Sequence, residues 1–361
     1  MTNDRPKINV VVLFGGQSGE HDVSLRSAQT VIGALDPDKY SVRHVGITRE
    51  GGWIASGDPM AALTATSPLF QIGDGGPQAT EVHAEQGLPV LTRETVDVVF
   101  PVLHGPMGED GTIQGMLELA GIPYVGSGVL GSAVAMDKAM AKLVLSQAGI
   151  DQAKWALVNR SEWEVDSESV ANSVATDLGL PCFVKPANMG SSVGVSKAHD
   201  DSELSEAIAL ALEYDRRVVV EEAINGRELE ISVLGNDQPV ASVAGEVVPC
   251  NEFYDFNAKY VNDDSDLIIP ADLDKEKMAE IQAVAVRAFR ALDLAGMARV
   301  DFFLERGSDR LLLNEVNTIP GFTSISMYPM LWEASGVALP DLVDRLVDLA
   351  VERHSRRRRV I

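Results

Sequence analysis

Continuous apolar runs alternate with helix-like stretches in the first third of the chain. Ile8–Phe14 is an apolar run rich in β-branched residues and Val96–Leu103 is a second apolar segment, as is typical of parallel strands buried on both faces. Helical periodicity follows each run, over Val23–Leu35 and Thr112–Ala120. Strand followed by helix is the repeating unit of α/β domains, so this part is predicted to form a parallel sheet. Residues 55–90 have weak periodicity and are expected to form a surface excursion.

Strands and helices mix without that repeating order beyond residue 136. Helical periodicity predicts helices over Met136–Ala148 and Lys275–Ala291, and the C-terminal end is also predicted to be helical. Short apolar runs predict strands at Cys182–Lys185, Val193–Lys197, Val218–Glu221, Leu229–Leu234 and Val240–Val248, and a hairpin of Arg299–Leu304 with Arg310–Val316. This mixture is typical of α+β domains.

The composition limits the kind of protein and the partners it can have. A length of 361 residues suggests two to three domains. With 30 basic and 53 acidic side chains the net charge is −23, which argues against nucleic acid and membrane surfaces as partners. Cys182 and Cys250 lack CxxC spacing, so neither a disulfide framework nor a zinc cluster is expected. The sequence has no signal-peptide pattern and no apolar run of ~20 residues, so a cytoplasmic location is expected.

One glycine motif invites a dinucleotide-binding interpretation. Gly126, Gly128 and Gly131 form G-x-G-x-x-G between a short predicted strand and a helix. This fingerprint belongs on the first strand of a domain, whereas here it comes deep into the chain, and no acidic residue closes a second strand about 20 residues later. A turn between domains explains the glycines better, and a nicotinamide-dependent dehydrogenase stays open as the alternative.

The segment CFVKPANMGSSVGVSK, residues 182–197, is a stronger candidate for chemistry. A predicted strand places Lys185 before a loop rich in Gly and Ser, whose N–H groups and hydroxyls can surround phosphate oxygens. The lysine adds a positive charge beside them. A structural hairpin would have the same composition, so the segment alone leaves phosphate binding open. The strand at residues 218–222 ends in carboxylates that could contact an adenine and ribose, but strand ends are commonly polar.

The predicted hairpin in the last third carries a patch of oxygen ligands. Because side chains alternate between the faces of a strand, Arg299 and Asp301 share one face, as do Glu315 and Asn317. Antiparallel pairing brings the two carboxylates and the amide together, where the charges repel unless a cation neutralises them. Such ligands suit Mg²⁺ shared with substrate phosphates, and a solvated polar face is the alternative. The loop NTIPGFTSIS follows directly, and its backbone donors could stabilise an oxyanion.

These segments occur in an order that resembles the ATP-grasp ligases, and within them the D-alanine–D-alanine ligase family. The matching stretches span nearly the whole chain: GGQSGEHDVSL (15–25), HGPMGEDGTIQGMLELAGIPYVGSG (104–128), MDK (136–138), VKPANMGSSVGVSK (184–197), YDFNAKY (254–260), ARVDFFL (298–304) and NEVNTIPGFTSISM (314–327). Together they are specific to this family, whereas no single stretch is.

The resemblance implies an α/β and α+β architecture, with an N-terminal parallel-sheet (pre-ATP-grasp) domain followed by a two-domain ATP-grasp fold. The implied domains are a substrate domain (1–137), a central domain with the glycine-rich loop (138–227) and a C-terminal domain with the metal site and a closing loop (228–361). In the implied reaction, ATP phosphorylates the carboxylate of one D-alanine, and the amine of a second attacks the acyl phosphate. The product, D-alanyl-D-alanine, serves peptidoglycan synthesis. ATP, two Mg²⁺ (or Mn²⁺) ions and a homodimer are implied with it.

The resemblance also implies roles for residues that match the family's motifs. Contacts to ATP are assigned to Lys138, Lys185, Ser192, Glu221, Glu222 and Glu228, and the metal ligands are Asp301, Glu315 and Asn317. The catalytic set is Glu20, which holds the first ammonium group, Ser191 and Tyr260, which handle the proton of the second amine, and Arg299, which stabilises the acyl phosphate and the tetrahedral intermediate. The substrate site is completed by His104, Lys259, Gly321, Ser326 and Met327.

Two positions depart from the family pattern. Glu222 stands where some relatives carry Lys beside the adenine, and His21 follows Glu20 where other members have Arg. The Lys259–Tyr260 pair argues for an amine nucleophile. An ATP-grasp ligase that transfers D-alanine to D-serine or D-lactate stays open as an alternative, as does an inactive ATP-binding protein, against which the intact set of site residues argues.

Overall fold

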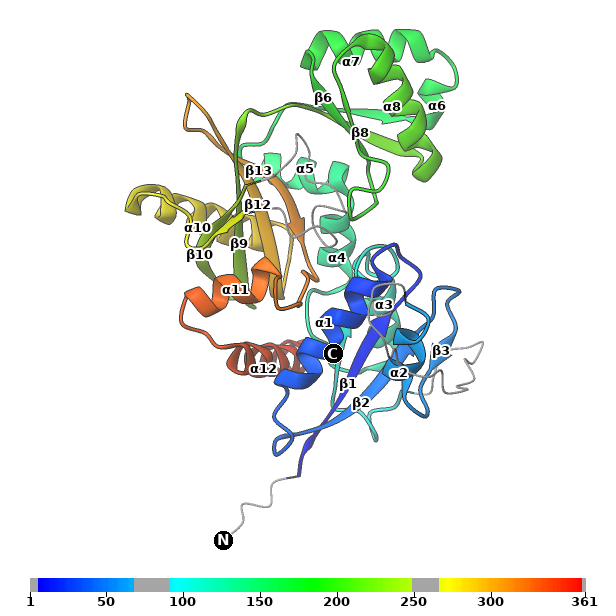
Figure 1. Cartoon of the computed structure of the whole chain (residues 1–361), viewed down its shortest axis with the longest axis vertical. Helices are drawn as coiled ribbons and strands as arrows, with labels where there is room; N and C mark the ends of the chain where they lie inside the picture. The colour runs from blue at the N-terminus through cyan, green and yellow to red at the C-terminus, as the bar shows by residue number, and fades with distance from the viewer. Residues whose placement is uncertain (1–5, 68–90, 249–265, 359–361) are drawn as a thin grey trace.

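The computed structural model describes residues 6–67, 91–248 and 266–358, and it arranges them around three β-sheets. The sheets follow one another along the chain, and in Figure 1 their colours run from blue to cyan for the first, through green for the second, and from olive green to orange for the third. Within the described residues, no helix has both the length and the apolar character that a membrane crossing requires.

The first sheet confirms the predicted parallel pairing. Its strands are β1 (Ile8–Gly15), β2 (Tyr40–Ile47), β3 (Trp53–Ile54) and β4 (Val98–Val102), in the order β3-β2-β1-β4. β1 is parallel to both β2 and β4, and β3 adds an antiparallel edge. The helices of this part of the chain are α1 (His21–Ala34), α2 (Pro59–Thr64), α3 (Thr112–Ala120) and α4 (Val129–Met136). Val10 and Val12 pack on one face of β1 while Val11 and Leu13 pack on the other, which explains the uninterrupted apolar run.

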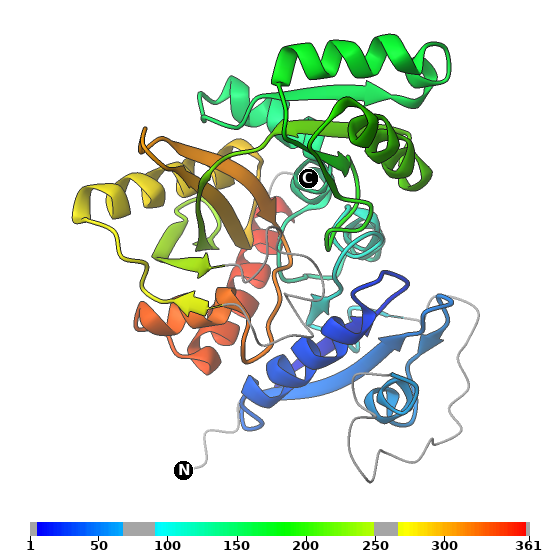
Figure 2. The same ribbon diagram turned by 45° about the horizontal axis from the view of Figure 1, so that its top comes forward.

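The second sheet is antiparallel and has the order β5-β8-β6-β7. Its strands are β5 (Trp155–Asn159), β6 (Cys182–Pro186), β7 (Ser196–Ala198) and β8 (Arg217–Glu222), and the helices of this region are α5 (Lys138–Gln147), α6 (Arg160–Trp163), α7 (Ser167–Leu178) and α8 (Asp201–Tyr214). α7 and α8 close a core of buried Val, Leu, Ile and Ala side chains over this sheet. In Figure 2 this unit lies above the other two sheets.

Two predicted boundaries in this region were wrong. Met136 belongs to α4, because Asp137 interrupts the helix and caps α5 by accepting a hydrogen bond from the Met140 N–H (3.0 Å). The strand predicted from Val193 begins only at Ser196. Ser191 and Ser192 have left-handed backbone angles, with φ of 50° and 58°, and therefore turn the chain instead of extending it.

The third sheet is also antiparallel, in the order β11-β10-β9-β12-β13. Its strands are β9 (Gly226–Gly235), β10 (Val240–Val248), β11 (Asp266–Ile268), β12 (Gly296–Glu305) and β13 (Leu311–Asn317), followed by α11 (Met327–Ala334) and α12 (Leu339–Arg358). α10 (Lys275–Ala291), which ends as predicted, packs against one face of β9 and β10, and α11 packs against the other.

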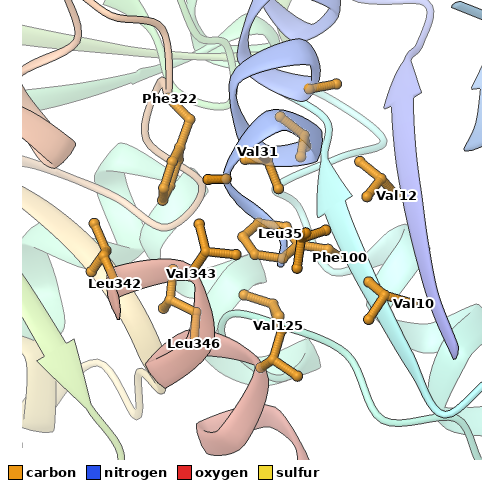
Figure 3. Close-up of a cluster of buried hydrophobic side chains, with 14 of the residues drawn as sticks. Val10, Val12, Val31, Leu35, Phe100, Val125, Phe322, Leu342, Val343 and Leu346 are labelled. Atoms are coloured by element: carbon orange, nitrogen blue, oxygen red, sulfur yellow. The ribbon is translucent and has the colours of Figure 1, made fainter. Parts of the chain in front are cut away.

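The last helix returns to the first sheet. Figure 3 shows Leu342 and Leu346 of α12 in one cluster with Leu35, the C-cap residue of α1, and Phe100 of β4. Phe322, from the loop after β13, joins the same cluster. The first and last parts of the chain therefore share a core, which fixes that loop beside the end of β4. The predicted domain boundaries, 1–137, 138–227 and 228–361, stay predictions.

Candidate active site

Two adjoining cavities lie where the three sheets approach one another. The larger, about 320 Å³, is lined by α5, β6, β8, β13 and the loop of residues 189–195. The smaller, about 80 Å³, is lined by the end of β4, by β12 and by the loop after β13. Glu20, Glu109, Ser191, Glu315 and Asn317 line both. These five side chains form the boundary between the two cavities, so a group transferred from one cavity to the other would pass beside them.

Most of the predicted site residues meet at this pair of cavities. Those at the larger cavity are Glu20, Lys138, Lys185, Ser191, Ser192, Glu221, Glu222, Glu228, Glu315 and Asn317. The smaller cavity adds His104, Arg299, Gly321, Ser326 and Met327. Asp301 lines neither cavity and accepts hydrogen bonds from Arg299, which lines the smaller one. Lys259 and Tyr260 lie outside the described residues.

Hydrogen bonds hold Lys138 and Lys185 at the larger cavity. Lys138, the first residue of α5, donates from Nζ to the carbonyl of Met189 (2.6 Å) and so fixes the glycine-rich loop. Burial lowers the pKa of Lys138. Lys185 of β6 donates to Glu221 Oε2 (2.7 Å) and lies 3.3 Å from Asn314 Oδ1. Both lysines extend into the cavity from regular secondary structure, Lys138 from α5 and Lys185 from β6.

Glu221 is the most tightly held carboxylate of the site. It is 4% exposed and forms ion pairs with Lys185 and with Lys142, whose Nζ lies 2.6 Å from Oε1. Burial alone would raise the pKa of Glu221, but the two lysines outweigh it and lower the pKa to about 2. Glu221 is therefore charged at every physiological pH.

The glycine-rich loop approaches Glu20 closely at Gly190. A Cβ at Gly190 would lie 3.2 Å from Glu20 Oε2, so glycine permits this close approach. Among the described residues, the buried hydroxyl of Ser191 has no hydrogen-bond partner. Left-handed angles at two successive serines cost conformational energy, and such strain concentrates at functional sites.

The hairpin of β12 and β13 brings the predicted residues next to one another. Asp301 pairs with Glu315 in the ladder, and Arg299 pairs with Asn317. Arg299 holds Asp301 through two hydrogen bonds of 2.7 Å and also contacts Glu230 Oε2 at 2.9 Å. On the opposite face, Val300, Phe302 and Leu304 are buried, as predicted. The Asn317 amide donates from Nδ2 to Asp301 Oδ2 (3.1 Å), so the carboxylates and the amide lie beside a fixed guanidinium.

Glu109 is a site residue that the sequence interpretation missed. It lines both cavities and accepts the N–H of Gly105 at 2.6 Å. Burial, and then the charge of Glu20, raise the pKa of Glu109 to about 8, although the Gly105 N–H lowers it. A carboxyl of this kind carries its proton at neutral pH.

His104 acts on the neighbouring loop. Its Nδ1 lies 2.8 Å from the carbonyl of Ile319, which can only accept, so Nδ1 carries the proton. Its Nε2 lies 3.2 Å from Ser27 Oγ, which also accepts the N–H of Phe322. Burial lowers the pKa of His104. The neutral imidazole therefore ties the end of β4 to the loop that carries Gly321.

That loop presents backbone donors at the start of α11. A Cβ at Gly321 would lie 2.8 Å from Ser326 Oγ, so only glycine fits without a shift. Ser326 Oγ accepts the N–H of Thr323 at 3.0 Å, and Met327 opens α11. The first N–H groups of a helix attract negative charge. A carboxylate is therefore a suitable occupant of this end of the smaller cavity.

Two of the other missed residues, Lys142 and Glu230, could have been found from their spacing in the sequence. Lys142 follows Lys138 by one helical turn, so α5 presents both lysines on one side. Glu230 shares a face of β9 with Glu228 and pairs with Asp301 in the ladder. Asn314, by contrast, reaches Lys185 from another sheet, and no local spacing indicates that contact.

The glycines of the G-x-G-x-x-G motif serve close packing between segments. A Cβ at Gly131 would lie 2.5 Å from the carbonyl oxygen of Asp293. Similarly, a Cβ at Gly296 would lie 3.0 Å from the Gly126 nitrogen. This agrees with a structural role for the motif and does not favour the dehydrogenase alternative.

Known proteins match the chain over almost its whole length. Residues 9–127 match the family model of the D-ala D-ala ligase N-terminus, and residues 144–348 match that of the D-ala D-ala ligase C-terminus. The chain is 48% identical to a D-alanine--D-alanine ligase of Acetivibrio thermocellus over 97% of both chains. It is 50% identical to one of Thermoanaerobacter sp. (strain X514), over 97% of this chain and 98% of the relative.

Solved structures agree with these matches. The D-alanine-D-alanine ligase from Coxiella burnetii has a TM-score of 0.81 and 35% identity, covering 99% of this chain and 97% of that one. VanG D-Ala:D-Ser ligase from Enterococcus faecalis has a TM-score of 0.80 and 37% identity, covering 95% and 99%. With both family models matched in order, and with this fold and pair of cavities, the chain belongs to the D-alanine–D-alanine ligase family.

Proposed function

We propose that the protein joins two D-alanines to D-alanyl-D-alanine at the expense of ATP, and so supplies peptidoglycan synthesis in the cytoplasm. The observation that carries this proposal is the pair of adjoining cavities with five shared side chains. A nucleotide in the larger cavity would place its terminal phosphate at the boundary. An amino-acid carboxylate in the smaller cavity could meet it there.

The larger cavity suits ATP. Lys138 and Lys185 would balance phosphate charge, and Ser192 in the strained loop would cover the phosphates. Glu221 and Glu228 lie on the strands where the adenine and ribose would bind. Glu222 accepts the N–H of Lys154 at Oε1 (2.8 Å) and donates its own N–H to the Lys154 carbonyl (3.0 Å), so both groups already have partners within the protein.

The metal ligands are part of the proposal. Asp301, Glu315 and Asn317 offer the oxygen atoms that Mg²⁺ or Mn²⁺ prefers, and Glu315 and Asn317 face both cavities. Two such ions would spread the charge of the phosphates. Two hydrogen bonds from Arg299 to Asp301 fix the guanidinium beside the proposed metal ligands.

The smaller cavity suits two amino acids. Glu20 would hold the ammonium of the first, and His104 would keep the surrounding loop in place. The guanidinium of Arg299 and the N–H of Gly321 would stabilise the acyl phosphate and the tetrahedral intermediate. Ser326 and the N–H of Met327 would bind the second carboxylate.

Three parts of the proposal rest on family resemblance. Ser191 and Tyr260 would handle the proton of the attacking amine, and Lys259 would close the site beside them. Exclusion of water protects the acyl phosphate from hydrolysis. A homodimer is proposed as well. Light scattering during size-exclusion chromatography, which measures the molar mass, tests it.

A substrate comparison tests the activity. The protein is incubated with Mg-ATP and D-alanine, L-alanine, D-serine or D-lactate, alone and in pairs, while ADP and coupled product are measured. Rapid ADP release with D-alanine alone, together with the dipeptide, is the expected result. Preference for D-alanine plus D-serine would instead assign the acceptor specificity named for the E. faecalis structure. ADP release without any coupled product would contradict ligation.

A further inference from the structure

Lys142 is a buried lysine that does not line either cavity. It lies one helical turn after Lys138 on α5, and its side chain is 3% exposed. Its backbone carbonyl accepts the side-chain N–H of Gln152 at 3.0 Å, which fixes the turn that carries it. A buried ammonium is costly unless it is paired, and Glu221 is the partner, at 2.6 Å.

Glu221 stands between two lysines with different surroundings. Oε1 faces Lys142, behind the wall of the larger cavity, and Oε2 faces Lys185, which lines it. Lys185 is also 13% exposed and has Asn314 as an alternative partner, whereas Lys142 is enclosed. One lysine of the pair can therefore reach a ligand and the other cannot.

This asymmetry has a consequence for nucleotide binding. If Lys185 shifts toward a phosphate, its bond to Glu221 weakens, and a buried carboxylate left unpaired would oppose the shift. Lys142 stays in place and keeps Glu221 neutralised. We propose that Lys142 is a positioning residue for the nucleotide, a permanent counter-ion of Glu221 that allows Lys185 to bind phosphate. This inference rests on the proposed ATP site.

The test measures the affinity for Mg-ADP by calorimetry, together with KM for ATP and for D-alanine. Lys142→Met removes the charge and keeps an unbranched side chain that is one atom shorter. It should weaken Mg-ADP binding and raise KM for ATP on the order of tenfold, with KM for D-alanine changed less than about twofold. Lys142→Arg keeps the charge and should restore most of the affinity. Lys154 is an exposed lysine of the same region, so Lys154→Met is the matched control. It should change neither the Mg-ADP affinity nor either KM.

A double-mutant cycle separates this role from simple support of the fold. In the Glu221→Gln background the carboxylate no longer needs a counter-ion, so adding Lys142→Met should cost no further affinity. Additive losses, or unchanged affinity in Lys142→Met, would overturn the inference. Should Lys142→Met fail to fold, Lys142→Gln provides the same comparison.

Lys185→Met distinguishes this inference from the proposed site. If Lys185→Met leaves the Mg-ADP affinity unchanged, the ATP site itself is wrongly placed. If Lys185→Met weakens binding and Lys142→Met does not, only the role of Lys142 is rejected.

Discussion

Phe322 connects the core of the first sheet to the loop that carries Gly321. Its ring is 1% exposed and meets Phe100 edge-on, with centroids 6.1 Å apart, and Tyr328 at 5.4 Å. Its N–H is bonded to Ser27, the hydroxyl that also contacts His104. The Gly321 amide therefore keeps its position only while this ring fills its place in the core.

Phe322→Ala should reduce both stability and activity. Removal of a buried phenyl group costs about 3–5 kcal/mol of unfolding free energy, through lost burial and the cavity left behind. The loop would then relax into that cavity and move the Gly321 amide. Because a shift of ~1 Å at a catalytic donor can cost up to ~100-fold, we expect kcat to fall at least about tenfold at temperatures where the variant is folded.

Leu346→Ala is the matched control. Leu346 is fully buried in the same cluster, but it lies on α12, away from both cavities. Its truncation should cost about 2–5 kcal/mol, which is comparable, without moving the loop. Urea unfolding measures the stability loss, and the coupled ADP assay measures kcat per folded molecule. Equal kcat values for the two variants would refute the link between this core and the Gly321 loop.

Three further predictions follow from the site and its surroundings. Glu315→Gln should abolish Mg-ATP turnover while circular dichroism stays native, and near-normal ADP release from the folded variant would reject the metal assignment. Because the pKa of Glu109 is about 8 in the folded protein, above its ordinary 4.5, the wild type loses stability as the pH rises between these values. Without Mg²⁺, Glu109→Gln should have the melting temperature of the wild type near pH 4 and a higher one near pH 9. Equal melting temperatures at both pH values would contradict the raised pKa. Gly131→Ala should lower the melting temperature because its Cβ would lie 2.5 Å from the Asp293 carbonyl, which is backbone and cannot rotate away; unchanged melting would show that the segments separate easily.

The local pattern of apolar and polar residues was sufficient to predict elements whose structure depends on the faces of one strand or on the period of one helix. β1 was predicted from its apolar run, which reflects burial on both faces, and α10 was predicted because its apolar positions recur with the helical period. The patch of Asp301 and Glu315 followed from strand alternation and a short turn alone. In each case the relevant neighbours are close in sequence.

Contacts between distant segments were beyond the reach of local pattern. Glu109 gives no signal in sequence, because its raised pKa depends on Glu20, which comes from another segment, and on burial by the whole fold. The packing of α12 on the first sheet depends equally on tertiary structure. The break at Asp137 was missed because a capping aspartate resembles any polar position of a continuous helix.

The charge around the cavities explains how an acidic protein can bind a nucleotide. Among the described lining residues, four are basic (Lys138, Lys185, Lys197 and Arg299) and seven are acidic (Glu20, Glu109, Glu221, Glu222, Glu228, Glu230 and Glu315). The proton on Glu109 and the ammonium of Lys142 remove part of that excess, but the balance stays negative. ATP without a metal would bring more negative charge to such a site. Binding of ATP should therefore depend on divalent cations, because only they reverse the sign of the charge that the phosphates meet.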